Sequence, residues 1–375
     1  MKLIFNSTVL VAPLNWGLGH ATRCVPLIKA LERLGAKVIL ASDGTALNLL
    51  KAEFPHLPAF QLPSYRIRYQ TDSMIWNIAR QMPRITCAIR AEQWATERLL
   101  REHGINGIIS DNRYGCFSAR AHSVILTHQI HLRVPNAALQ WAANQVLRRA
   151  LRKFDTIWVP DAATEPNLSG ELSHPPLNGF DTQYLGLLSR FSEDSPPAFA
   201  KISAGKVAVV LSGPEPQRTY LEQILMEQAL ALPHKFVFVK GKTHAKEHHI
   251  VAENVEVVSY LTSSDLNKLL RSSQVVVCRA GYSSIMDLVA LGRKKAILVP
   301  TPGQTEQEYL GDFFARRGIF ICQKQEKVDL KTGLQAVEET TGSFSQPTEI
   351  DLFEPILSEW LRDLPLKQGV TSSKV

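Results

Sequence analysis

Residues suited to chemistry stand in glycine-rich or polar turns that follow short apolar blocks. The first turn carries Gly17, Gly19 and His20 just before a helical pattern. Glycines at such a point let the backbone turn tightly and approach a ligand, while the helix start offers unpaired N–H groups. A histidine there has its cationic form disfavoured, so it is ready to accept a proton. We therefore predict an anion or sugar-hydroxyl pocket with a base. The alternative is a histidine that only caps its own helix.

Two later turns supply partners for this histidine. Asp111 and His128 each follow an apolar block in the same half of the chain. Their positions fall at the carboxyl edge of one parallel sheet together with His20, where a carboxylate can orient an imidazole. We expect His20 and Asp111 to form a catalytic pair, with Arg113 and His128 on the acceptor side. The alternative for Asp111 is a helix cap or an internal pair with Arg113.

The second half repeats the strand, glycine and helix pattern and adds positive charge. Ser212 and Gly213 precede Arg218, an arrangement suited to a diphosphate. Two later strands are followed by further polar residues. A glycine and hydroxyls at a helix start can receive an oxyanion, a carboxylate can hold a ribose, and amides and carboxylates can bind sugar hydroxyls. The alternative is a polar, solvated turn. These residues are Arg279, Gly281, Ser283, Ser284, Asp287, Gln304, Gln307 and Glu308.

Buried parallel strands alternating with helices are needed to position these turns. The blocks are apolar throughout rather than alternating, which is typical of strands covered on both faces and joined by right-handed crossovers. We predict an α/β protein with two doubly wound, Rossmann-like domains facing across a cleft, over residues 1–186 and 204–348. Residues 187–203 form the predicted linker, and residues 349–375 a C-terminal helix and tail. The predicted strands are Thr8–Ala12, Lys37–Ala41, Ala59–Leu62, Gly107–Ser110, Ser123–Leu126, Thr156–Val159, Lys206–Leu211, Lys235–Val239, Val255–Ser259, Gln274–Cys278, Ala296–Val299 and Ile319–Cys322.

Composition excludes several classes of protein. The 375 residues are 45% hydrophobic and 21% charged, enough apolar surface to offset chain entropy and to exclude disorder. No apolar run approaches the roughly 20 residues of a membrane helix, and the N-terminus suits a strand better than a signal peptide, so we expect a cytoplasmic protein. The five cysteines include no C-x-x-C pair and are expected to be reduced core thiols. A net charge of +7 permits nucleic acid, a membrane surface or an anionic substrate.

The order of these motifs resembles the GT-B glycosyltransferases, specifically the family 28 enzymes that include the lipid II-forming N-acetylglucosaminyltransferase. The resemblance covers nearly the full length and is carried by the G-x-G-H turn, Cys278 to Asp287, and the later segment with Gln307. It implies that His20 lies near the acceptor hydroxyl, that Ser212, Gly213 and Ser284 contact phosphates, and that Asp287 binds the ribose. It also implies that Gln307 and Glu308 bind the donor sugar and that the backbone of Leu261 contacts the base of the nucleotide. The family commonly has Glu at the ribose position and two glutamines where this chain has Gln307 and Glu308.

These observations predict a glycosyltransferase that moves a sugar from a nucleotide-diphosphate sugar, most simply a UDP-sugar, to a hydroxyl. We expect inversion and no metal, with helix N-termini and Arg218 or Arg279 taking up the diphosphate charge. A UDP-sugar 2-epimerase of the same fold, a nicotinamide oxidoreductase using Gly17, Gly19 and Asp43, and a non-catalytic nucleotide-sugar sensor are the alternatives. No cofactor and no nucleic-acid partner are expected.

Two other patterns bear on partners. His244-x-x-x-His248-His249 has the spacing of helical metal ligands, but Lys242 and Lys246 crowd it with charge, so a solvated loop is expected. Basic residues interleaved with apolar ones fill Tyr65 to Arg90 and Trp141 to Lys153. They predict peripheral association with an anionic membrane at its inner face and a lipid-linked acceptor, and the alternative is ordinary solvated helix faces.

Overall fold

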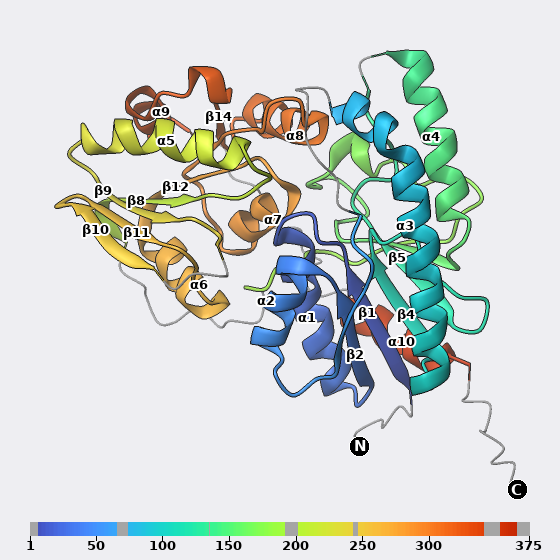
Figure 1. Ribbon diagram of the computed structural model, residues 1–375. Helices are drawn as coiled ribbons and strands as arrows, with labels where there is room; N and C mark the ends of the chain where they lie inside the picture. Colours follow the sequence, from blue (N-terminus) through green and yellow to red (C-terminus); the bar gives the residue numbers. More distant parts are fainter. Residues whose placement is uncertain are drawn as a thin grey trace, which may run out of the picture.

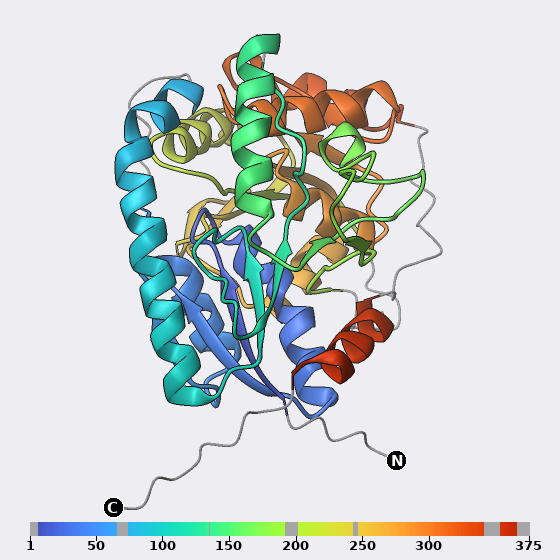
Figure 2. The ribbon, with the colours of Figure 1, turned by 90° about the vertical axis from the view of Figure 1, so that its right-hand side faces the viewer.

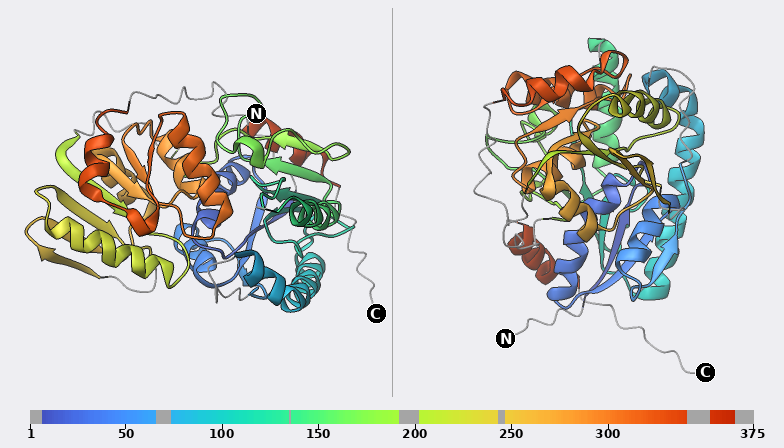
Figure 3. Two further views of the ribbon diagram at one scale, coloured as in Figure 1. Left: turned by 90° about the horizontal axis from the view of Figure 1, so that it is seen from above. Right: turned by 90° about the vertical axis from the view of Figure 1, so that its left-hand side faces the viewer.

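The computed structural model describes residues 7–65, 74–134, 136–191, 202–242, 247–340 and 353–365, with the backbone alone for residues 74–79. Two α/β halves lie side by side, each built on a twisted sheet with helices on its faces (Figures 1 and 3). The predicted fold class is confirmed.

The first sheet has seven parallel strands in the order β3-β2-β1-β4-β5-β6-β7. Its central strands are buried along their whole length, which explains why they are apolar rather than alternating. The strands are β1 (Thr8–Pro13), β2 (Lys37–Ser42), β3 (Ala59–Gln61), β4 (Gly107–Asp111), β5 (His122–Leu126), β6 (Thr156–Val159) and β7 (Thr182–Tyr184). The helices of this half are α1 (Gly19–Arg33), α2 (Gly44–Glu53), α3 (Met74–His103) and α4 (Ala137–Leu151), with a 3₁₀ turn at η1 (Gly170–Leu172).

The second sheet also has seven strands, in the order β10-β11-β9-β8-β12-β13-β14. All its pairs are parallel except β10 with β11. The strands are β8 (Ser203–Val210), β9 (Lys235–Val239), β10 (His248–Ala252), β11 (Val255–Val258), β12 (Ser273–Cys278), β13 (Ala296–Leu298) and β14 (Ile321–Cys322). The helical segments are α5 (Gln217–Leu230), α6 (Ser263–Ser272), α7 (Tyr282–Ala290), α8 (Thr305–Arg316), η2 (Gln325–Lys327) and α9 (Leu330–Ala336).

Two strands were missed by the sequence analysis. β7 has three residues and is only half-buried, so it lacks an apolar block. β10 contains His248 and His249, which were expected in a solvated loop; that expectation is wrong, because both residues pair with β11 at the edge of the sheet. Their side chains are exposed, as are those of Ile250 and Val251. An exposed edge strand carries no buried face from which it could be recognised.

The last described helix, α10 (Phe353–Asp363), returns to the first half of the chain. Figure 2 shows it in red beside the blue N-terminal elements. Trp360 donates from Nε1 to Nδ1 of His122 at 2.8 Å and meets the ring of Trp158 edge-on at 5.3 Å. A Cβ at Gly107 would lie only 2.6 Å from the Trp360 ring, so β4 needs glycine where this helix crosses it.

Candidate active site

His20 and Asp111 meet at the carboxyl edge of the first sheet, as their positions after neighbouring strands predict. Asp111 is the last residue of β4, and His20 lies in the first turn of α1, directly after β1. Nδ1 of His20 lies 2.8 Å from Oδ1 of Asp111. A neutral imidazole in this contact donates from Nδ1, which leaves the lone pair of Nε2 to accept a proton. The pair therefore has the geometry of a base and its orienting carboxylate.

Arg23 completes this cluster and was missed by the sequence analysis. Its Nε donates to Oδ2 of Asp111 at 2.6 Å, and its Nη2 donates to Oδ1 of the same carboxylate. Nη2 also lies 3.0 Å from Nδ1 of His20. Because an ionised carboxylate can only accept, we assign the hydrogens of both groups to Asp111, so that Nδ1 of His20 donates. Burial opposes ionisation of Asp111, but the charge of Arg23 and the hydrogen bonds from Arg23 and His20 outweigh it and hold the pKa of this carboxyl below its usual range. Asp111 is thus a buried, permanently charged carboxylate. The available sequence signal was the spacing of three residues from His20, which puts both side chains on one face of α1.

His128 joins this cluster to the second half of the chain. Its Nδ1 lies 2.8 Å from Nη1 of Arg23, and its Nε2 lies 2.9 Å from Oε1 of Glu306. Because a guanidinium can only donate, Nδ1 is the acceptor and Nε2 carries the hydrogen given to Glu306. Burial lowers the pKa of His128 despite the opposing effect of Glu306, so the ring is neutral. The Tyr282 ring stacks on His128 with centroids 4.1 Å apart.

The glycine-rich turn touches the start of α7 directly. Ser283 donates from Oγ to the carbonyl of Gly19 at 3.1 Å, and a Cβ at position 19 would come within 2.9 Å of that hydroxyl oxygen. Gly17 has a φ of +82°, in the left-handed region that favours glycine. Glycine is needed at position 17 for its backbone conformation, and at position 19 for the close contact between the two halves.

Arg113, which was expected on the acceptor side, lies in a buried network of ion pairs. Its guanidinium is fully buried and pairs with Glu92 and, at 2.8 Å, with Asp43. It also donates to the carbonyls of Pro13 and Pro63. Arg113 therefore braces the carboxyl ends of the strands. The same ion pair occupies Asp43, the acid that a nicotinamide site would use for a ribose.

On the facing edge of the second sheet, Arg279 is a buried cation without a buried counter-charge. It follows β12 and donates to the carbonyls of Val299, Pro300 and Gln217. Among the residues that the structure describes, it forms no ion pair, and burial lowers its pKa to about 10. Its Nε has no hydrogen-bond partner. A buried donor and charge left in this state are costly unless an anion binds them.

The surroundings of this guanidinium are also suited to an anion. Gly213 follows β8 with a φ of +100°, and a Cβ there would lie 3.6 Å from Oγ1 of Thr301 and 3.9 Å from Nε of Arg279. The Thr301 hydroxyl is buried and, like Nε of Arg279, has no hydrogen-bond partner in the described part of the chain. The start of α7, capped by Gly281, follows Arg279 directly. A helix start, a hydroxyl and a guanidinium thus follow neighbouring strands at one edge.

Arg218, in contrast, is already neutralised. It pairs with Glu215 and, at 3.0 Å, with Glu222. Of the two arginines expected to share the diphosphate charge, only Arg279 has no carboxylate partner in the part of the chain that the structure describes. The spacing of three and four residues between Arg218 and these glutamates was a readable signal for helical ion pairs.

Asp287 faces the segment that connects the two halves. Ser189 donates from Oγ to Oδ1 of Asp287 at 2.6 Å, and Nε of Arg190 lies 3.5 Å from Oδ2. Burial raises the pKa of Asp287 against the lowering effect of Arg190. In this structure the expected ribose ligand therefore anchors the connecting segment.

The side-chain amides and carboxylates that follow β13 form hydrogen bonds within their own loop. Oε1 of Gln307 accepts from the backbone of Thr301 at 2.9 Å, and Nε2 of Gln307 donates to Gln304. Glu308 accepts from the backbone of Gly303 at 3.1 Å. The remaining predicted donor-side residues, Ser212, Ser284 and Leu261, are half-buried. All of these residues belong to the second half of the chain, and their neighbour Glu306 reaches across to His128.

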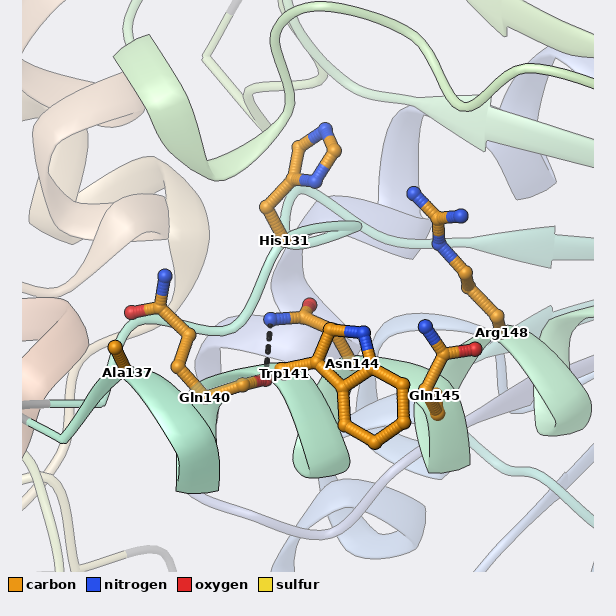
Figure 4. Close-up of a pocket in the computed structure, with 7 residues that line it drawn as sticks. All are labelled: His131, Ala137, Gln140, Trp141, Asn144, Gln145 and Arg148. Carbon is orange, nitrogen blue, oxygen red and sulfur yellow. Dashed lines mark hydrogen bonds between the residues drawn. The ribbon is translucent and has the colours of Figure 1, made fainter.

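Helix α4 carries a separate shallow pocket of about 390 Å³. Figure 4 shows His131, Trp141 and Arg148 around it, while Asn144 donates to the Gln140 carbonyl. The Trp141 side chain is 68% exposed. The exposed apolar and basic residues of this helix and its C-terminal end are Leu139, Trp141, Val146, Arg149, Arg152 and Lys153.

Other members of the two basic segments are placed differently. Leu147 is buried in the core and cannot contribute to a surface, contrary to expectation. Tyr65 is also buried and donates to Glu92. Arg80, Arg84 and Arg90 are exposed on α3. The side chains of Arg66, Arg68, Tyr69, Ile75 and Trp76 lie outside the described residues.

Neither a metal cluster nor a membrane span occurs in the described residues. No group of three or more His, Cys, Asp or Glu side chains there is placed to hold a metal ion. His248 pairs with Glu256 at 2.8 Å, and His244 lies outside the described ranges. Within the same ranges, no helix is long and apolar enough to cross a bilayer.

Comparison with known proteins identifies the class of enzyme. Residues 207–345 match the family model described as the glycosyltransferase family 28 C-terminal domain. An uncharacterized glycosyltransferase of Methanopyrus kandleri is 23% identical over 327 residues, which are 83% of this chain and 90% of that one. The chain is a glycosyltransferase with a family 28 C-terminal domain. The alternative of a nicotinamide oxidoreductase is therefore wrong.

Two further comparisons concern this glycosyltransferase, one over part of the chain and one over nearly all of it. A UDP-N-acetylglucosamine–N-acetylmuramyl-(pentapeptide) pyrophosphoryl-undecaprenol N-acetylglucosamine transferase of Sulfurihydrogenibium is 26% identical over 125 residues, 33% of this chain and 35% of that one. The crystal structure of the glycosyltransferase SnogD from Streptomyces nogalater superposes with a TM-score of 0.59 at 17% identity, covering 96% of each chain. The fold is that of the GT-B glycosyltransferases.

Proposed function

We propose that this glycosyltransferase moves a sugar from a nucleoside-diphosphate sugar, most simply a UDP-sugar, to an acceptor hydroxyl with inversion. Arg279 is the observation that carries the proposal. Within the described ranges this buried guanidinium has no carboxylate partner and the nearby Thr301 hydroxyl has no hydrogen-bond partner, so together with the start of α7 they are suited to receive a leaving diphosphate. We propose on the same basis that the charge of the diphosphate is met without a metal ion.

The acceptor side is supplied by the first half of the chain. Nε2 of His20 accepts the proton of the acceptor hydroxyl as that oxygen attacks the anomeric carbon and the bond to the diphosphate breaks. Asp111 holds the ring through Nδ1 and stabilises the imidazolium that forms. The contact of Gly19 with Ser283 shows how closely the two edges approach.

We further propose that the acceptor is lipid-linked and is met at an anionic membrane surface in the cytoplasm. The exposed Trp141, Leu139 and Val146 lie on the same helix as Arg148 and Arg149, in the half that carries His20. Apolar side chains beside basic ones are what an interfacial helix presents to an anionic bilayer.

Thermal unfolding with a panel of nucleotides and nucleotide sugars tests the donor assignment. We expect UDP to raise the unfolding midpoint in proportion to the logarithm of its concentration, with or without EDTA, and NAD to leave it unchanged. Transfer that stops in EDTA and returns with manganese or magnesium would refute the metal-independent mechanism. Turnover of a UDP-sugar without any acceptor would point instead to the epimerase.

A further inference from the structure

An unbroken series of contacts runs from the proposed base to the opposite half of the molecule. It passes from His20 to Asp111, from Asp111 to Arg23, and from Arg23 through His128 to Glu306. The first four residues belong to the half with the first sheet, and Glu306 stands in the first turn of α8 in the other half. A change in the relative position of the two halves must therefore break this series at one place, between His128 and Glu306.

Arg23 is the residue of this series that contacts Asp111 on one side and His128 on the other. Two of its N–H groups hold the Asp111 carboxylate as a fork, and a third points to Nδ1 of His128. Its Nη2 also lies 3.0 Å from Nδ1 of His20, so Arg23 is in contact with the ring that it positions. The side chain is 1% exposed, so no water replaces a partner that is lost. A lysine ammonium at this depth could serve the carboxylate or the imidazole, but its single nitrogen lacks the planar spread needed for both.

His128 has one arrangement that suits both of its neighbours. With its hydrogen on Nε2, it donates to Glu306 and accepts from Arg23. With the hydrogen on Nδ1, it would present a donor to the donor Nη1 of Arg23 and leave Glu306 unpaired. Glu306 therefore selects the tautomer that Arg23 requires, and the stacked Tyr282 holds the ring in plane.

We propose that Arg23 is a positioning residue that relays the closure of the two halves to His20. The proposal rests on the proposed function, because it assigns a purpose to the orientation of the base. When the halves are together, Glu306 fixes His128, His128 accepts from Arg23, and Arg23 holds Asp111 where it accepts from Nδ1 of His20. When they separate, the tautomer of His128 is no longer selected and the fork on Asp111 is disturbed. The base is thus correctly oriented only while the half proposed to hold the donor is in contact.

Glu306 is the place to test this relay, because its side chain is 30% exposed and does not touch His20. Long-range ¹H–¹⁵N spectra of the full chain with labelled histidine report the tautomer of each ring. We expect His20 to carry hydrogen on Nδ1 and His128 on Nε2. In Glu306→Ala the His20 signals should move, and kcat should fall about 10- to 100-fold with KM for the nucleotide sugar within about 3-fold. The charge of Glu306 also acts on His20 through space, so Glu306→Gln, which lacks that charge but keeps an acceptor for His128, separates the relay from this direct effect. Glu306→Gln should restore part of the wild-type His20 spectrum and part of kcat, since its amide oxygen still accepts from Nε2 of His128.

A matched control is another ion pair across the same junction, between Glu165 and Arg317 at 3.4 Å. Glu165→Ala also removes one carboxylate from the contact between the halves, yet it should leave the His20 spectrum and kcat unchanged. The relay is wrong if Glu306→Ala gives the same His20 spectrum and the same kcat as Glu165→Ala. The spectra require no sugar transfer. A shifted His20 in an enzyme that transfers no sugar would therefore overturn the proposed function and leave the relay standing.

Discussion

The free nitrogen of His20 makes the most direct prediction among single residues. His20→Ala removes the proton acceptor but no contact to the donor half, so kcat should fall about 10²-fold or more while UDP affinity stays nearly unchanged. Single-turnover transfer and calorimetric titration measure the two quantities. His56→Ala is the control, because His56 pairs with Glu32 at the surface. A parallel loss of UDP affinity in His20→Ala would make His20 a structural residue.

Arg279 and Arg218 form a natural pair for testing the diphosphate site. Arg279→Met removes a guanidinium without a counter-charge, and UDP affinity should weaken by about 1.5 to 3 kcal/mol. Arg218→Met removes a guanidinium that two glutamates already neutralise, so it should lower the free energy of unfolding and leave UDP affinity nearly unchanged. Calorimetry with UDP decides between the two arginines. Equal losses in both variants would contradict this assignment.

The sequence predicted that His20 and Asp111 lie together, but not the residues that support them. His20 and Asp111 could be brought together because each follows a strand of one parallel sheet, and parallel strands share a carboxyl edge. Arg23 lies inside a helix, where an arginine is ordinarily solvated, and only the packed structure shows that it is buried against Asp111. The contacts of Asp287 with Ser189 and Arg190 depend on the path of the connecting segment, which local patterns do not encode.

At the level of elements, helix α4 makes a prediction about membranes. Attraction to anionic lipid is worth about 1 kcal/mol for each basic side chain near the surface, so charge reversal at Arg148, Arg149 and Arg152 should release the protein. We expect the wild type to float with anionic but not neutral vesicles and to be released by salt.

The control for this experiment reverses the same number of charges elsewhere. Lys324, Lys327 and Lys331 are exposed on the other half, and their replacement by glutamate should leave flotation unchanged. A wild type that stays at the bottom of the gradient with anionic vesicles at low salt would refute the membrane assignment.

Strands were predicted correctly where burial on both faces requires a continuous run of apolar residues. β1 and β4 are covered on both faces and read as continuous apolar blocks. β7 and β10 lie at the edges of their sheets and are set by pairing with a neighbour rather than by a buried face, so composition does not reveal them.

For the whole molecule, the junction between the halves predicts how stability depends on pH. The pKa of His128 is lowered in the folded protein, where Arg23, Tyr282 and Glu306 surround the ring, whereas the unfolded chain binds a proton near the ordinary value of about 6.5. The unfolded state therefore binds more protons as the pH falls through this value, and the free energy of unfolding should decrease from pH 7 to pH 5. Denaturant unfolding across this range measures the slope.

The variant His128→Gln isolates the contribution of His128 to the pH dependence of stability. Glutamine does not titrate, so the difference in stability between wild type and variant should narrow toward pH 5. Parallel curves for the two proteins would show that His128 does not sense pH.

The packing of α10 onto the first sheet sets the order in which a nascent chain can fold. Nδ2 of Asn106 donates to the carbonyl of Pro365, which is made 259 residues later, and Trp360 covers Gly107 at the start of β4. The strands of the first sheet are all made by Tyr184 and those of the second by Cys322, both before α10. This surface of the first sheet therefore stays uncovered while the C-terminal half is synthesised. A chain that ends near residue 340 should be cut by protease in its N-terminal half more readily than the full chain, because the last helix to be made protects the first sheet to be made.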